Sequence, residues 1–308
     1  MTDRPFRFGV SATAIPADRA AWQDQARRYE DLGFDVLLLA DHLGVMLPPL
    51  VPLVSAADAT ERLRLGTFVL NNDFWHPSLL ARDAAATDLL TGGRLELGLG
   101  AGHAQGEYES SGLTYDRPGV RVERLAEAVP LLRRLLDGET VDHDGPHYTL
   151  RAAATGIATA QHRVPLLVGG NGDRLLALAA RHADIVGLVG FTSGTGQVHT
   201  DLSHFTWAGL AERIAHVRRH TGDRADAIEL NILVQQVATG DRRAAADRLA
   251  AQIGQPAELF LDSPFVMLGS PDDLAAHVAR LRDAGVTYVV AFAERGAADL
   301  APVIARQR

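Results

Sequence analysis

The chain contains no cysteine among its 308 residues. This absence excludes disulfide bonds, a thiolate nucleophile, zinc–thiolate sites and iron–sulfur clusters, because each of them requires a cysteine sulfur. Redox chemistry in this protein would therefore depend on a bound organic cofactor.

Lysine is missing as well, since all 30 residues counted as Lys plus Arg are arginines. Without a side-chain primary amine the protein cannot form a Schiff base, carry covalent pyridoxal phosphate or use a P-loop lysine. A bound phosphate would have to be held by arginines, backbone amides or hydroxyl groups.

Excess positive charge and long apolar runs are also absent. The net charge of −8 leaves no cationic face for nucleic acid or for an anionic membrane. No apolar run approaches the ~20 residues that span a bilayer, and no basic-then-apolar segment opens the chain. We therefore expect a soluble, cytoplasmic protein that binds neither nucleic acid nor membranes.

Strand-like and helix-like patterns alternate along the chain. The predicted strands are 6–13, 36–40, 63–70, 95–99, 164–168, 184–189, 228–237 and 287–292. The predicted helices are 17–32, 48–60, 77–90, 120–136, 173–182, 207–221, 242–253 and 271–284, followed by a terminal helix. This order predicts an α/β fold, a TIM (β/α)8 barrel, as one domain over 1–308. An open doubly wound sheet is the alternative, but its glycine-rich fingerprint after the first strand is missing.

Two segments interrupt this alternation and are predicted insertions, approximately 139–163 and 191–206. In the first, 141–150 has the pattern of a β-hairpin, with Asp144-Gly145 in its middle. In the second, the polar run 192–203 is rich in Gly, Ser and Thr and is predicted to be a mobile loop.

The C-terminal ends of the predicted strands carry the candidate site residues, and in TIM barrels this end holds the active site. Asp41 and His42 follow the buried run of the second strand. A histidine there can exchange a proton with a bound substrate near neutral pH. The alternative is that Asp41 caps the next loop and His42 is a solvated neighbour.

The exit of the third strand is unusually rich in amides and aromatic residues. Asn71-Asn72-Asp73 is followed by Phe74-Trp75-His76 just before a proline. Aromatic residues in such a loop can form the wall of a site for a flat heterocycle or a substrate. They can equally staple the loop to its neighbours. On the first interpretation, Asn71 and Trp75 lie on the substrate side.

Two glycine-rich turns complete the set. Gly100-Ala101-Gly102-His103 ends the fourth strand, with Glu107 shortly after, and Gly169-Gly170-Asn171-Gly172 joins a strand to a helix. Glycine lets the backbone approach a ring closely, and the unpaired amides of a helix N-terminus suit a phosphate. Ordinary tight turns are the alternative for both.

These motifs, in this order, resemble the luciferase-like flavin and deazaflavin oxidoreductase superfamily over nearly the whole chain. The most specific matches are Ala40-Asp41-His42, the run 64–69 and the run 91–102, supported by 169–172 and 268–271. The sequence looks most like the branch of coenzyme F420-dependent oxidoreductases, whose cofactor is a 5-deazaflavin hydride carrier. The resemblance implies a TIM-type barrel.

The resemblance also implies roles for individual residues. Phe68-Val69 stands where the superfamily carries a non-proline cis peptide under the cofactor ring, and His42 and His103 are candidate proton donors. The implied catalytic residues are His42, His103 and Asp41. The implied cofactor-binding residues are Asp41, Phe68, Val69, Gly100, Gly102, Gly169, Gly170, Asn171 and Gly172. Asn71, Trp75 and Glu107 are assigned to the substrate side, and no metal site is expected.

His103 departs from the family pattern. F420-dependent sugar dehydrogenases carry a glutamate proton donor at this position and many relatives carry tryptophan, so we do not predict a sugar-phosphate dehydrogenase. The leading hypothesis is hydride transfer between the deazaflavin C5 and a C=O, C=N or activated C=C bond, as a reductase of specialised metabolism. An FMN-dependent monooxygenase and a cofactor-free partner subunit remain alternatives. A homodimer is expected, since dimers are common among oligomers.

Overall fold

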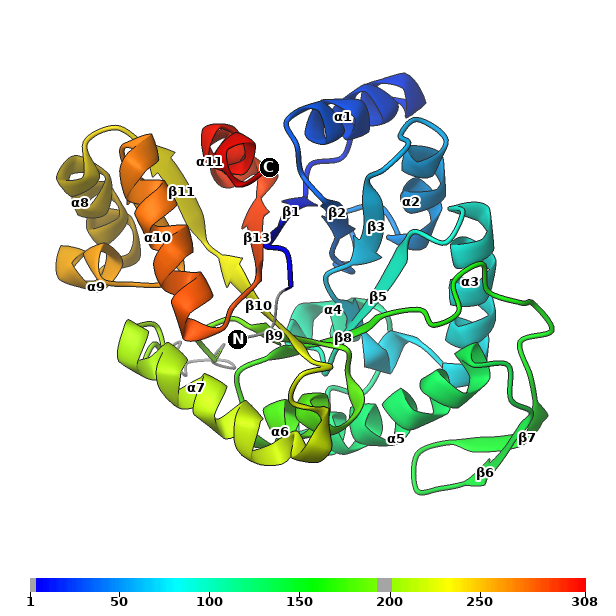
Figure 1. Cartoon of the computed structure of the whole chain (residues 1–308). Helices are drawn as coiled ribbons and strands as arrows, with labels where there is room; N and C mark the ends of the chain where they lie inside the picture. The colour runs from blue at the N-terminus through cyan, green and yellow to red at the C-terminus, as the bar shows by residue number, and fades with distance from the viewer. Residues whose placement is uncertain (1–3, 193–200) are drawn as a thin grey trace.

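The computed structural model describes residues 4–192 and 201–308, and within them the main strands close into a parallel barrel (Figure 1). The strand order is β3-β2-β1-β13-β10-β9-β8-β5-β4, and a pairing between β3 and β5 closes the ring. Helices surround the strands on the outside (Figure 1). The predicted TIM barrel is confirmed, whereas its extent as a single domain over 1–308 stays a prediction.

Most elements lie where the sequence predicts them. The barrel strands are β1 Arg7–Ala12, β2 Val36–Leu39, β3 Arg64–Thr67, β4 Leu70–Asn71, β5 Leu95–Gly100, β8 Leu166–Gly170, β9 Ile185–Leu188, β10 Glu229–Val234 and β13 Tyr288–Phe292. The surrounding helices are α1 Arg19–Asp31, α2 Leu50–Ala57, α3 Pro77–Leu90, α5 Pro118–Leu136, α6 Asp173–His182, α7 Trp207–His220, α8 Arg242–Ile253, α10 Pro271–Ala284 and α11 Ala301–Gln307. Among these described helices, none is long and apolar enough to cross a membrane.

Two predicted strands are each divided in the structure. The predicted strand 63–70 is split into β3 and β4 around the Phe68–Val69 peptide bond, which is cis as the resemblance implies. The predicted strand 228–237 is split into β10 and β11 Gln236–Thr239. β11 turns away from the barrel because it pairs with β12 Val266–Gly269, a short strand that the sequence pattern did not reveal. The short helices α4 Gln105–Ser110 and α9 Ala257–Leu261 were also missed.

The predicted hairpin is present and projects from the barrel (Figure 1). Its strands are β6 Val141–Asp144 and β7 Thr149–Ala153, so it ends three residues later than predicted. Glu127 of α5 anchors it by accepting hydrogen bonds from the His143 ring at 2.8 Å and from the Tyr148 amide at 2.9 Å. Most of the predicted mobile loop at 192–203 lies outside the described residues.

The inside of the barrel is apolar in the middle and charged at its N-terminal end. The buried apolar side chains are Val36, Leu38, Leu167, Ile185, Leu233, Tyr288 and Val290. Below them, Arg7 pairs with Glu96 at 2.6 Å and with Glu229 at 2.5 Å. Arg64 pairs with the same Glu96 oxygen at 2.7 Å. This ion-pair network fills the N-terminal end, which leaves the C-terminal end for chemistry.

Candidate active site

Three predicted site residues meet at the C-terminal end of the barrel. His42 follows β2. His103 and Glu107 follow β5, more distant in the sequence, and Glu107 lies in α4. The His42 Nδ1 atom lies 2.7 Å from Glu107 Oε1. The His42 and His103 rings stand edge to face, with their centroids 5.4 Å apart. The parallel strands therefore assemble an acid–base cluster from two exit loops.

Asp41 is buried, with 8% of its surface exposed, and it links β2 to the exit of β4. Its Oδ2 atom accepts a hydrogen bond from Trp75 Nε1 at 2.9 Å and one from the Asn71 amide at 3.4 Å. Burial raises the pKa of the Asp41 carboxyl, although these two donors oppose the change. Asp41 therefore positions Trp75 and Asn71. Its carboxylate binds the exit loop of the neighbouring strand instead of the loop that directly follows β2.

The His103 residue is exposed to solvent, yet the surrounding protein partly desolvates its imidazole ring. This desolvation, together with the charges of His42 and Arg121, lowers the pKa of His103 despite the opposing carboxylate of Glu107. Its imidazole is therefore neutral at pH 7. The Tyr115 hydroxyl donates to the His103 carbonyl at 3.0 Å and holds the backbone of this residue in place.

Arg121 supports the same loop and was not among the predicted site residues. Only 4% of its surface is exposed, and its Nε donates to the Ala101 carbonyl at 3.2 Å. The guanidinium also donates to the Asp116 carbonyl and lies 4.2 Å from the centre of the Tyr115 ring. A helical arginine is usually exposed, so no signal in the sequence distinguished this one.

Tyr108 of α4 is a second positioning residue that sequence reasoning missed. It is fully buried, and its hydroxyl lies 3.1 Å from both Asn71 Oδ1 and Asp73 Oδ2. Gly102 passes beside this pair with a φ of +75°, and a Cβ atom there would collide with the Tyr108 hydroxyl and Asn71 Oδ1. Glycine at this position therefore allows the two exit loops to pack against each other.

A glycine-lined floor lies beside the acid–base cluster. A Cβ atom added at Gly100 would come within 2.7 Å of Val69, and one at Gly98 or Gly169 within 3.3 Å or 3.6 Å. The Val69 side chain therefore rests on bare backbone of β5 and β8, and Phe68 packs on the apolar cluster inside the barrel. The structure thus gathers the predicted cofactor residues Phe68, Val69, Gly100 and Gly169 around one apolar surface.

The second glycine turn lies at the start of α6. Gly172 is the N-cap, and no side chain caps the amides of the first turn. Asn171 is buried and lies 3.3 Å from both Thr192 Oγ1 and His204 Nδ1, while its Oδ1 atom has no partner among the described residues. Arg213 of α7 pairs with Asp173 at 2.5 Å and reaches the Asn171 carbonyl. Free amides beside a buried arginine suit an anionic group.

The remaining predicted site residues include Gly170 and Trp75, which lie beside these features. Gly170 lies between the floor and the turn, with a Cβ at that position meeting only the Leu175 side chain within 3.5 Å. Trp75 packs against the main core as well as bonding to Asp41, so it both staples its loop and borders the site. Across residues 4–192 and 201–308, no group of three or more His, Asp or Glu side chains could hold a metal ion.

The sequence profile described as luciferase-like monooxygenase matches residues 4–288. The chain belongs to this family. This luciferase-like protein is 33% identical over 188 residues to an F420-dependent glucose-6-phosphate dehydrogenase of Microbacterium testaceum, covering 58% of the chain and 55% of that enzyme. It is 32% identical over 240 residues to the enzyme of the same name from Nakamurella multipartita, covering 75% and 69%.

The fold has solved counterparts as well. The coenzyme F420-dependent tetrahydromethanopterin reductase of Methanopyrus kandleri superimposes with a TM-score of 0.78, covering 99% of this chain and all of that one at 18% identity. Such low identity establishes the shared fold alone. The chain spans little more than half of the M. testaceum relative, so the substrate named for that enzyme is not transferred here. The family recognised from Asp41-His42 and the glycine motifs is confirmed.

Proposed function

We propose that this luciferase-like protein is a coenzyme F420-dependent oxidoreductase, which exchanges hydride with a small organic substrate through a C=O, C=N or activated C=C bond. The observation that carries the proposal is the carboxylate-paired histidine, His42 with Glu107 at 2.7 Å, at the same end of the barrel as a glycine-lined apolar floor. The F420-dependent relatives support the choice of cofactor.

The residues at the barrel mouth fit a deazaflavin. Val69 and the bare backbone of Gly100 and Gly169 offer an apolar surface on which a flat ring can lie. The uncapped start of α6, beside Arg213, would hold the cofactor phosphate without a lysine. When bound, the deazaflavin supplies a hydride donor or acceptor at C5. The protein supplies orientation, shielding from water and the accompanying proton.

We assign the proton transfer to His42. Its Nδ1–H donates to Glu107, which leaves Nε2 as the atom that gives a proton to a substrate oxygen or nitrogen, or takes it back. The Glu107 carboxylate stabilises the imidazolium in the same way as other histidine–carboxylate pairs. His103 has a lowered pKa and is neutral at pH 7, so we assign it to orienting the substrate beside His42.

Turnover with each cofactor tests this function. Purified protein is mixed under anaerobic conditions with reduced F420 and a panel of ketones, imines and enones, and recovery of the oxidised F420 absorbance is followed. We expect recovery with at least one substrate class. Oxygen consumption with reduced FMN, and no exchange with F420, would instead indicate a luciferase-like monooxygenase. No turnover with either cofactor would favour a non-catalytic subunit.

We also propose that the protein is a homodimer. Adjacent helices α2 and α3 expose four large aliphatic side chains, Val51, Leu79, Leu89 and Leu90, and α2 packs against α3. Exposed apolar faces of this kind are typical of association surfaces, and a two-fold axis would bury each face on its copy. Light scattering should give twice the monomer mass, and the variant Val51→Glu/Leu90→Glu should give the monomer mass.

The proposed location is the cytoplasm. A diffusible hydride carrier has to be recycled by other enzymes that draw on the same pool, so enzyme and carrier must share a compartment. Cell fractionation of the producing organism would test this, with the protein expected beside other F420-binding activities.

A further inference from the structure

A cleft among the outer helices is separate from the acid–base cluster. It lies beside the start of α7, where α8, α9 and α10 pack around β12 on one side of the barrel (Figure 1). The space measures about 590 Å³, including the part open to solvent, which falls within the ~300–1,000 Å³ of small-molecule sites. Within the described residues, the cleft and the acid–base cluster have no lining residue in common.

The inner wall of this cleft consists of three buried apolar side chains, Phe260, Val266 and Leu268. Trp207, the first residue of α7, also lines the cleft. The guanidinium of Arg280 lies 3.9 Å from the centre of the Trp207 ring, and the centroid of the His277 ring lies 5.1 Å from that of Trp207. The cleft therefore combines an apolar wall with an aromatic ring that already binds a cation on one face.

Two arginines that line the cleft retain hydrogen-bond donors for a ligand. Arg242 donates to the Leu261 carbonyl at 2.5 Å and forms no ion pair within the described part of the chain. Arg280 has only Asp262, at 3.6 Å, and such a long pair between two exposed side chains contributes little. The lining also contains the carboxylate of Asp273, but its Oδ2 accepts hydrogen bonds from the N-cap residue of α10 at 2.7 and 2.8 Å. A guanidinium has five N–H donors, so most of them are available to an anion.

His277 adds an uncharged acceptor to the same cleft. Burial and the positive charges of Arg280 and Arg242 lower its pKa to about 4, although the Pro264 carbonyl opposes the change. The imidazole is therefore neutral at pH 7. Its Nε2 lies 3.1 Å from the Pro264 carbonyl oxygen, so Nε2 carries the hydrogen and Nδ1 is left as an acceptor.

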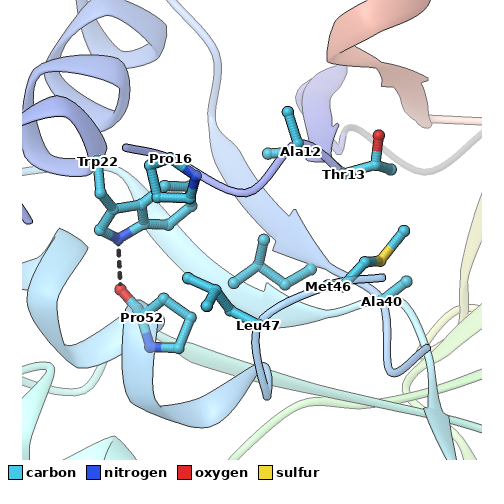
Figure 2. Close-up of a pocket in the computed structure, with 10 residues that line it drawn as sticks. Ala12, Thr13, Pro16, Trp22, Ala40, Met46, Leu47 and Pro52 are labelled. Carbon is cyan, nitrogen blue, oxygen red and sulfur yellow. Dashed lines mark hydrogen bonds between the residues drawn. The ribbon is translucent and has the colours of Figure 1, made fainter. Parts of the chain in front are cut away.

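A smaller hollow beside β1, β2 and α2 lacks these polar groups. Figure 2 shows this space, which measures about 260 Å³ including the part open to solvent. None of its described lining residues carries a charge, and the indole N–H of Trp22 already donates to the Pro52 carbonyl at 2.8 Å. It has no group that recognises an anion, so the cleft beside α7 is the better candidate for a ligand site.

We propose that the cleft beside α7 binds an organic carboxylate with an apolar body. The guanidinium groups of Arg242 and Arg280 attract the carboxylate, and the inner wall covers the apolar body. His277 Nδ1 accepts a hydrogen bond from a hydroxyl or N–H group of the ligand where it has one. The site is additional to the barrel mouth, and it does not depend on the proposed function.

Calorimetric titration of the whole protein with 2-naphthoate tests the inference. 2-Naphthamide has the same rings without the charge, and acetate has the charge without the rings. We expect one 2-naphthoate per chain and at least ~10-fold weaker binding of the other two compounds. Arg242→Gln and Arg280→Gln should each weaken 2-naphthoate binding about 10-fold. Arg243→Gln is the matched control, because Arg243 pairs with Asp247 and Glu258, which do not line the cleft.

A blocking variant and a competition experiment complete the test. Ala276 is exposed on α10 and lines the cleft, so Ala276→Phe should abolish 2-naphthoate binding with little change in Tm. Saturating F420 should leave the affinity for 2-naphthoate unchanged. Three results would overturn the inference: no binding of 2-naphthoate at millimolar concentration, equal affinity for 2-naphthoate and 2-naphthamide, or displacement of 2-naphthoate by F420, which would place the carboxylate at the barrel mouth.

Discussion

The two ends of the barrel use the same kinds of side chain in opposite ways. At the N-terminal end, Glu96 lies within 2.7 Å of two guanidinium groups, those of Arg7 and Arg64. At the C-terminal end, Glu107 lies 2.7 Å from the imidazole of His42, a type of side chain that serves as a general acid or base. Pairing with arginines stabilises the first end, and the histidine–carboxylate pair equips the second for proton transfer.

The pKa values of two buried carboxyl groups shift in opposite directions at the two ends of the barrel, because only one of these groups lies beside arginines. Burial of Glu96 opposes its ionisation, but the charges of Arg7 and Arg64 outweigh this and hold its pKa below the usual range. Asp41 is buried without an arginine partner, and its pKa is raised. The two buried carboxylates therefore differ in their partners: arginines lie beside Glu96, whereas Asp41 is held by the neutral donors Trp75 and Asn71.

The largest expected effect is on stability, from Glu96→Gln. Without the Glu96 carboxylate, Arg64 has no carboxylate partner and Arg7 keeps only Glu229. Removing one partner of a buried ion pair typically costs about 3–5 kcal/mol in the free energy of unfolding. Urea denaturation measures it. The matched control is Asp24→Asn, which breaks the exposed pair with Arg27 and should cost less than about 1 kcal/mol. Equal stability of the two variants would show that the N-terminal network is not what stabilises the barrel.

At the C-terminal end, the next largest effect is expected from Gly169→Leu. A Cβ atom at this position meets neighbours no closer than 3.6 Å, which is ordinary van der Waals contact, and we expect the rest of the leucine side chain to extend over the floor. We expect F420 affinity to fall at least ~100-fold, equivalent to about 2.7 kcal/mol, with little change in Tm. Gly106→Ala, which adds a Cβ in open space, is the control. Undiminished F420 binding would show that the glycine-lined floor is not part of the cofactor site.

The proton-transfer residues should affect turnover without affecting cofactor binding. His42→Ala should lower kcat about 10²–10⁴-fold, the usual contribution of a general acid. Glu107→Gln keeps the shape of the pair but removes the charge, so a smaller loss is expected. His103→Ala should also lower kcat, by less than His42→Ala. If kcat in both histidine variants equals that of the wild type, the assignment of the cluster is wrong.

The smallest expected effect is the pH dependence caused by Asp41. Its pKa is higher in the folded than in the unfolded state, so its charged form weakens the fold above that pKa. The penalty disappears as the pH falls through the folded pKa. Asp41→Asn should therefore be slightly more stable than the wild type at pH 7, by less than about 1 kcal/mol, and equally stable at low pH. A stability difference that grows on acidification would contradict the sign of this shift.

The strands and the residues at their ends could be predicted because both follow from local pattern. The apolar run before Asp41 identifies a buried strand, and the barrel rule then places Asp41 and His42 at the active end. The partners of these residues could not be predicted. The contact of His42 with Glu107 joins two exit loops, and the burial of Arg121 depends on how α5 packs against a loop, so both are determined by tertiary structure. β12 was missed because a four-residue strand outside the barrel has no distinctive period.

An equilibrium titration of the protein with F420 and, separately, with FMN tests the central claim most directly, and Gly169→Leu is titrated in parallel. We predict saturable binding of F420 by the wild type, much weaker binding of FMN, and loss of F420 binding in the variant. Tight binding of FMN with no binding of F420 would contradict the assignment of the barrel mouth as a deazaflavin site.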